Sequence, residues 1–219
     1  MLVNPVLPDK ALSVSHETIY CAIHAMPRTR GSERRAGGLP NMTSIHLRPP
    51  EVAARIVTGH WEGALFKGAM NRSSVATLVE RTGRYVMLDC GTAPDSLKGF
   101  KRRLKTIPIP ESLRNTMTYE QGSEMAPHET LSAKLHMDIF FCDPHSPWQR
   151  GSNENANDLI REFLPKGTDL NLVSHQQLTS IEHALNHRPR KILGFHFQSP
   201  HEVFSRLSPE FIAGVALQA

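Results

Sequence analysis

The most informative segment of the chain is Phe141-Cys-Asp-Pro-His-Ser-Pro-Trp-Gln-Arg-Gly-Ser-Asn-Glu-Asn155, which leads from an apolar strand-like run into a helix-like one. Pro144 and Pro147 stiffen the loop between the two. Glu154 falls in the first turn of the predicted helix, where the helix dipole stabilises a carboxylate. Because a merely solvated acid is favoured at the same position, this placement alone leaves the role of Glu154 open.

The residues before this segment alternate between strand-like and helix-like patterns. Three apolar runs, separated by short turns, follow one another closely enough to predict an antiparallel meander. We predict strands at residues 61–66, 73–79, 85–90, 116–119 and 138–142, and helices at residues 94–105 and 129–135. This order indicates an α/β domain in which helices flank a mixed, five-stranded sheet.

The residues after the segment are predicted to be helical. Ser152 is expected to cap a helix that runs to Leu164. The apolar side of this helix is predicted to consist of Ala156, Leu159, Ile160 and Phe163. A capping box of Ser174 and Gln177 opens the next helix, and residues 201–207 form a last short one.

The chain before residue 58 has a different character. Residues 13–25 predict a single helix, with Ser15 as its N-cap. Residues 27–57 are rich in Arg, Gly and Pro with little periodicity, so they are predicted to form a basic linker. Residues 58–207 would then be the core of the protein, and residues 208–219 a tail.

Bulk composition narrows the possible classes of protein. The 219 residues carry a net charge of +4, which suits a nucleic-acid partner without proving one. The three cysteines, Cys21, Cys90 and Cys142, are scattered, which favours a reducing compartment and excludes a zinc-ligand spacing. Without a long apolar run or a signal peptide, we expect a bacterial cytoplasmic protein with no membrane partner.

Several long segments together resemble bacterial transposases of the "insertion sequence thirty" family. The matching segments are Val14-Ser-His-Glu-Thr-Ile-Tyr20, Gly59-His-Trp-Glu-Gly63, Asn71-Arg-Ser73, Thr77-Leu-Val-Glu-Arg81, Asp143 to Asn155, Leu164-Pro-Lys-Gly-Thr-Asp169, Asn186 to Leu193 and Pro200-His-Glu-Val-Phe204. The resemblance implies a ribonuclease-H-like fold with a DDE site. In such a site three acids hold two Mg²⁺ or Mn²⁺ ions for DNA cleavage and strand transfer.

Position by position, the resemblance implies a triad at Ala64, Glu120 and Glu154. The family has aspartate at the first two positions, so the first acid is missing and the second is one methylene longer. Glu62 would share the strand face of Ala64 but lies roughly 6.6 Å along the strand, which makes it a poor substitute. We therefore expect Glu120 and Glu154 within about 12 Å of each other, but a defective catalytic and metal site.

The resemblance also implies contacts with DNA. Residues 1–26 resemble the remnant of a helix-turn-helix domain, with His16 and Thr18 on its last helix. Because the chain begins only a few residues earlier, we expect a truncated copy of the transposase. The other predicted DNA contacts are Trp148, Arg150, Arg188, Arg190 and Lys191. For Trp148 a role as a plug in the core is an equally good interpretation.

Two functions therefore remain open at this point. The first is a transposase catalytic domain, acting on DNA as a homo-oligomer but chemically defective. The second is a non-catalytic DNA-binding or assembly protein, which inhibits intact transposases by forming mixed oligomers with them. Both use the same scaffold, so they are separated by tests of metal binding and DNA cleavage rather than by fold.

Overall fold

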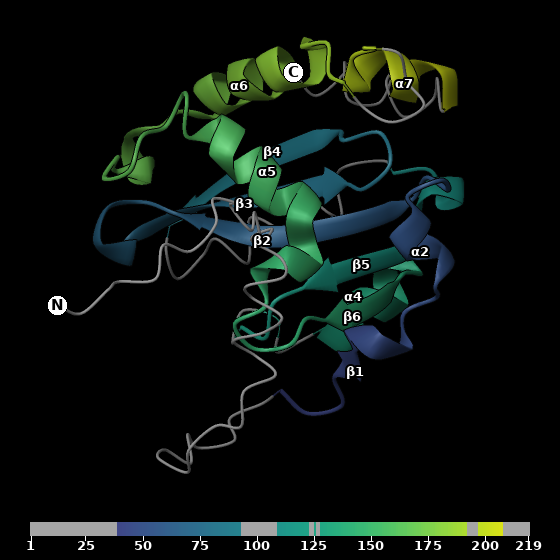
Figure 1. Cartoon of the computed structure of the whole chain (residues 1–219). Coiled ribbons are helices and arrows are strands. Elements are labelled where there is room, and N and C mark those ends of the chain that lie inside the picture. The colour runs from purple at the N-terminus through teal and green to yellow at the C-terminus, as the bar shows by residue number, and fades with distance from the viewer. Residues whose placement is uncertain (1–38, 93–108, 123–124, 126–127, 192–196, 208–219) are drawn as a thin grey trace, which may run out of the picture. The chain divides into compact units, whose positions relative to one another are not determined.

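A mixed sheet of six strands forms the centre of the described region (Figure 1). The computed structural model describes residues 39–92, 109–122, 125, 128–191 and 197–207. All of these residues belong to one compact unit, Gly38–Ala219. The predicted helices at residues 13–25 and 94–105 lie outside the described residues.

The strands follow the order β1-β6-β5-β2-β3-β4 across the sheet. Their bounds are β1 Thr43–Ser44, β2 His60–Lys67, β3 Ser73–Glu80, β4 Val86–Thr92, β5 Thr116–Tyr119 and β6 Asp138–Phe141. Strands β2, β3 and β4 pair antiparallel, whereas β1, β6, β5 and β2 pair parallel. The five predicted strands and their antiparallel meander are thus confirmed, with small shifts of their ends.

A sixth strand lies where the sequence predicted a linker. Part of the stretch 27–57 forms β1, the short 3-10 helix η1 (Ile45–Leu47) and α2 (Glu51–Ala54). Strand β1 pairs parallel with β6, and Val52 of α2 is fully buried. The predicted count of five strands was therefore wrong by one. A two-residue strand has no periodicity to detect, because its pairing depends on β6, which lies far along the chain.

The longer described helices are α4 (His128–Leu135), α5 (Gly151–Ile160), α6 (His175–His187) and α7 (Pro200–Leu207). They confirm the four helices predicted within the described residues. The capping box at the start of α6 is present as predicted, since Ser174 and Gln177 exchange side-chain and backbone hydrogen bonds. None of the described helices has the length and apolarity needed to span a membrane.

Helix α5 differs from its prediction at both ends. It begins at Gly151, and Ser152 is a buried residue inside it rather than its cap. The preceding 3-10 turn η5 (Pro147–Arg150) runs directly into the helix and starts it early. The helix ends at Ile160, so Phe163 turns out to be 43% exposed while Leu164 is buried. The apolar periodicity fails there because the helix gives way to turns, in which the N–H groups of Phe163 and Leu164 both donate to the carbonyl of Ile160.

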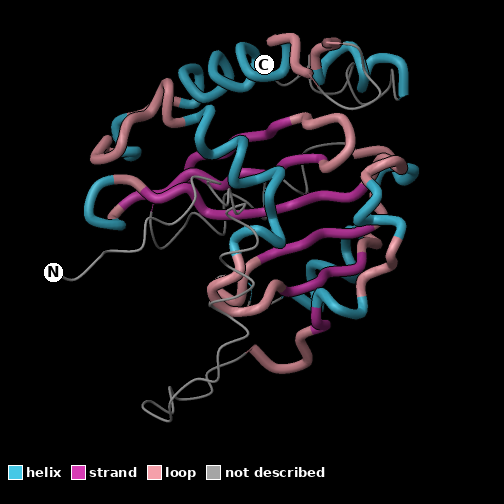
Figure 2. The backbone as a smooth tube through the Cα atoms, in the orientation of Figure 1, coloured by secondary structure: helices cyan, strands magenta, loops and turns pink. Residues whose placement is uncertain are grey.

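Helices cover both faces of the sheet, and each face has its own apolar core. Figure 2 shows α5 crossing the strands on one face. Helices α5 and α6 pack on Phe66, Val75, Val79 and Leu88 of that face. On the other face, α4 and α7 pack on Trp61, Met117 and Tyr119. Side chains alternate along β2, so Glu62 and Ala64 lie with Phe66 on the face covered by α5.

Candidate active site

Glu120 directly follows β5, at the carboxyl end of that strand. Strands β2 and β5 run parallel with Glu62 beside Thr118, and the same register continued by two residues brings Ala64 beside Glu120. Gln121 donates to the carbonyl of Cys142 at 2.9 Å, which ties this loop to the end of β6. The side chain of Glu120 is 61% exposed, so its carboxylate is accessible from outside.

Glu154 lies in the first turn of α5, as predicted. Its side chain is 44% exposed and lies beside the end of β5, where Glu154 and Glu120 both contact Arg150. Partial burial raises the pKa of the Glu154 carboxyl, while the cation of Arg150 lowers it and the nearby Glu120 raises it again. The two acids therefore lie at the same end of the sheet.

The guanidinium of Arg150 lies at all three positions of the predicted triad. Its Nη2 forms an ion pair with Glu120 and a second one, at 3.4 Å, with Glu154. Its Nη1 donates to the carbonyl of Gly63 at 3.2 Å, directly before Ala64. Since both carboxylates contact one nitrogen atom, they lie far closer together than the expected limit of about 12 Å, a distance well beyond the span of a two-metal clamp.

Ala64 supplies only a methyl group at the first position. Its side chain is 6% exposed, and its carbonyl accepts a hydrogen bond from Thr77 Oγ1 at 3.3 Å. The neighbouring Asn153 of α5 also bonds to Thr77, so the helix packs closely on this part of β2. The strand therefore offers no side-chain oxygen at residue 64.

Glu62 is engaged within the protein. It is fully buried, and it forms an ion pair with the buried guanidinium of Arg81. Its second oxygen accepts the backbone N–H of Asn153 at 2.8 Å, so it caps the first turn of α5 in place of a local side chain. Nothing in the sequence near Ser152 could reveal this cap, because the carboxylate comes from a distant strand.

The residues present do not fit a two-metal site. Two dications held about 4 Å apart need several carboxylate oxygens, including one from the first strand. Here the first position is Ala64, and the two remaining acids share the cation of Arg150. Within the described residues, no group of three or more His, Cys, Asp or Glu side chains gathers as metal ligands.

The predicted DNA-contacting residues lie in different environments. Trp148 is partly exposed in η5. Arg150, a predicted DNA contact beside the site, is only 2% exposed, and its guanidinium lies between the two acids. A contact between Arg150 and DNA stays a prediction. His16 and Thr18 lie outside the described residues.

The three basic residues after α6 are also placed differently from one another. Arg188 is exposed and pairs with Glu162 at 3.0 Å. Arg190 is partly buried and donates to the carbonyl of Leu185 at 3.0 Å, and burial lowers its pKa to about 10. Lys191 is exposed. Arg188 and Lys191 are thus accessible to a phosphate, whereas Arg190 also stabilises the end of the helix.

Comparisons with known proteins place the chain among transposases. One relative is the transposase for insertion sequence element IS1086 of Cupriavidus metallidurans. The two sequences are 48% identical, and the match covers 93% of this chain and 65% of that transposase. Another relative is the transposase InsI for insertion sequence element IS30A of Escherichia coli. The two sequences are 39% identical, and the match covers 90% of this chain and 57% of that transposase. The chain thus spans about three fifths of these relatives. No family model matches it.

A solved structure agrees with the fold. The catalytic core domain of BIV integrase aligns with a TM-score of 0.50 and 14% identity, over 69% of this chain and 97% of that domain. At such an identity the likeness concerns the fold alone, which is ribonuclease-H-like. The sequence relatives and this fold agree: the chain is similar to IS30-type transposases of insertion sequence elements, and its fold is that of a transposase/integrase-like core.

Proposed function

We propose that this protein is a transposase core that binds DNA but does not cut or join it. The observation that carries the proposal is the single guanidinium of Arg150, which contacts Glu120, Glu154 and the backbone next to Ala64. One monovalent cation, supplied by the protein, thus lies among the residues that match the family's triad. The relatives are named as transposases of insertion sequence elements, which supports DNA as the substrate class.

The proposed loss of DNA cleavage follows from the carboxylate ligands that remain for metal ions. Carboxylates hold hard dications by charge and by fixed geometry, and Ala64 contributes neither. Glu120 carries its carboxylate one methylene further out than an aspartate, and a displacement of roughly 1 Å can cost about a hundredfold in rate. Glu62 cannot replace the missing acid without breaking its ion pair with Arg81 and uncapping α5.

Binding to DNA does not need the acids. It depends on basic side chains that contact phosphates, and such contacts carry little sequence information. The net charge of +4 and the exposed Arg188 and Lys191 support weak, sequence-independent binding. Association with further copies, or with an intact transposase in a mixed oligomer, remains a prediction of the same proposal.

The test compares the natural protein with a variant in which both aspartates are restored, Ala64→Asp/Glu120→Asp. Calorimetric titration with Mn²⁺ and Mg²⁺ should show weak binding by the natural protein and at least about tenfold tighter binding by the variant. The matched control adds Glu154→Gln to the restored pair and should lose the gain. In parallel, the natural protein should leave a supercoiled plasmid intact in the presence of either metal.

Two results would contradict the proposal. One is equally tight binding of two Mg²⁺ ions by the natural protein and by the restored variant. The other is metal-dependent nicking by the natural protein that disappears in Glu154→Gln, which would show that Glu120 and Glu154 still support catalysis. Loss of DNA binding at low salt would refute the DNA-binding part alone.

A further inference from the structure

Four arginines lie together next to the candidate active site, and we call them the arginine cluster: Arg48, Arg55, Arg81 and Arg84. Arg48 follows η1, and Arg55 ends α2 in the left-handed conformation with φ 55°. Arg81 follows β3, and Arg84 precedes β4 with φ 61°. Their guanidinium groups are close enough to perturb one another, since the neighbouring arginines lower the pKa of Arg48, Arg81 and Arg84 in addition to the larger effect of burial.

The cluster has fewer negative charges than positive ones. Glu62 forms an ion pair with Arg81. Glu80 is the other nearby acid, and burial raises its pKa to about 7 while backbone N–H groups such as those of Gly59 and Gly83 donate to its carboxylate. The thiol of Cys142 is also close but stays neutral, because burial raises its pKa to about 12.

Several donors of the cluster lack partners. Arg81 is only 4% exposed, and its Nε atom has no hydrogen-bond acceptor within the described residues. Within the described part of the chain, the guanidinium groups of Arg55 and Arg84 form no ion pair. Arg55 is exposed and Arg84 is partly exposed, so both can be reached from outside. Accessible guanidinium groups that have no carboxylate partner are available to bind an incoming anion.

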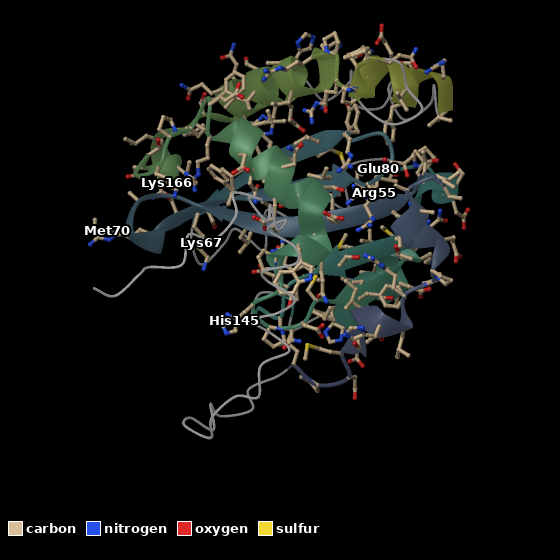
Figure 3. The ribbon with its side chains drawn as sticks, in the orientation of Figure 1. Arg55, Lys67, Met70, Glu80, His145 and Lys166 are labelled. Atoms are coloured by element: carbon tan, nitrogen blue, oxygen red, sulfur yellow. The ribbon has the colours of Figure 1, made fainter. Side chains whose placement is uncertain are left out.

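The cluster borders the start of α5 and therefore the acids. A Cβ added to Gly151 would lie 3.6 Å from Nη2 of Arg55, which places that guanidinium against the first residue of the helix. Arg48 donates to Thr118 Oγ1 at 3.0 Å, two residues before Glu120. In Figure 3, Arg55 and Glu80 lie on one side of α5, whereas Lys67 and Lys166 lie on the other.

We infer that the arginine cluster is a phosphodiester-binding site, which holds the DNA backbone beside Glu120 and Glu154. Guanidinium groups bind phosphate oxygens through paired hydrogen bonds, and they do so best where they have no competing carboxylate. A bound phosphodiester would also relieve the repulsion among the four cations. This inference rests on the DNA-binding function proposed above, but it concerns only where the backbone lies.

The test removes the two unpaired cations and keeps most of each side chain, as Arg55→Gln/Arg84→Gln. Fluorescence anisotropy with a short labelled DNA duplex should show weaker binding at every salt concentration. The slope of log affinity against log salt should become shallower by roughly two, since each lost phosphate contact removes roughly 0.9. The charge-preserving variant Arg55→Lys/Arg84→Lys should keep most of the affinity and the full slope.

The matched control is Lys134→Gln/Arg206→Gln, which removes the same charge from α4 and α7 on the opposite face of the sheet. It should bind the duplex as the natural protein does. The inference is overturned if Arg55→Gln/Arg84→Gln binds like the natural protein, or if the control weakens binding to the same extent. It is also overturned if inorganic phosphate displaces the duplex at matched ionic strength, because the site would then take the free anion.

The outcomes separate this inference from the proposed function. Unchanged DNA binding by Arg55→Gln/Arg84→Gln would refute the location of the site and leave DNA binding by the protein intact. If the natural protein itself fails to bind the duplex at low salt, both the location and the DNA-binding proposal are wrong. Neither result bears on the metal titrations, which test the chemical defect. Thermal unfolding of each variant checks that the fold is kept.

Discussion

Two charged clusters meet at the start of α5, and their charges are balanced in opposite ways. In the first, the guanidinium of Arg150 is shared by Glu120 and Glu154, so acids outnumber bases. In the arginine cluster, four arginines lie near two acids, Glu62 and Glu80, so bases outnumber acids. The Arg150 guanidinium lies between two carboxylates, whereas Arg55 and Arg84 of the second cluster form no ion pair within the described residues and can be reached from outside.

Under the function that we propose, the acidic cluster has lost its catalytic role while the arginine cluster still offers a binding surface. Replacing the first acid by Ala64 removes charge only from the cluster that would carry out the reaction. The arginines are anchored by a separate ion pair, that of Glu62 with Arg81, which also caps α5. The two clusters therefore depend on different residues, and single substitutions should separate them.

The largest effect is expected from Glu62→Gln. This change breaks a buried ion pair and leaves Arg81 as an uncompensated buried charge, which should lower the free energy of unfolding by about 3–5 kcal/mol. Chemical denaturation measures it. The control is Glu162→Gln, which breaks the exposed pair with Arg188 and should cost only about 0–1 kcal/mol. Equal losses in the two variants would mean that Glu62 does not anchor the arginine cluster.

A smaller effect is expected from the titration of Glu80. Its pKa is raised from 4.5 to about 7 in the fold, so the folded protein keeps a proton that the unfolded chain loses between these values. The stabilisation is complete below pH 4.5 and is lost as the pH rises through 7, by about 3 kcal/mol in all.

The measurement is a series of denaturation curves between pH 4.5 and 8 for the natural protein and for Glu80→Gln. Burial lowers the pKa of His60 and His201, so these histidines change the free energy of unfolding with pH in the opposite direction. Subtracting the curve of the variant from that of the natural protein removes their contribution and leaves that of Glu80. In the variant, the decrease in the free energy of unfolding with rising pH that comes from Glu80 should disappear. An unchanged slope would show that Glu80 is ionised throughout and that the arginine cluster is better balanced than we infer.

The smallest effect is expected from Arg55→Gln/Arg84→Gln in the absence of DNA. Removing two cations from a crowded cluster relieves repulsion, so the free energy of unfolding should stay equal or rise, by about 0–1 kcal/mol. Lys134→Gln/Arg206→Gln is again the control and should change little. A loss of more than about 1 kcal/mol would indicate that these arginines serve the fold rather than a ligand.

The fold was largely predictable because its strands and helices carry local patterns. The runs that became β2, β3 and β5 alternate or end at clear turns, and the capping box of α6 is contained in the four residues from Ser174 to Gln177. The prediction failed where a partner is distant. Strand β1 needs β6 to exist, and the start of α5 is capped by Glu62 from β2 rather than by Ser152.

The candidate site divides in the same way. The sequence by itself predicted, through its resemblance to the family, that Ala64, Glu120 and Glu154 stand at the three acidic positions. Only the tertiary structure decided what surrounds them: Arg150 lies between two acids, Glu62 pairs with Arg81, and four arginines come together from three loops. Ion pairs and burial join residues far apart in the chain, and only folding brings such partners within reach of one another.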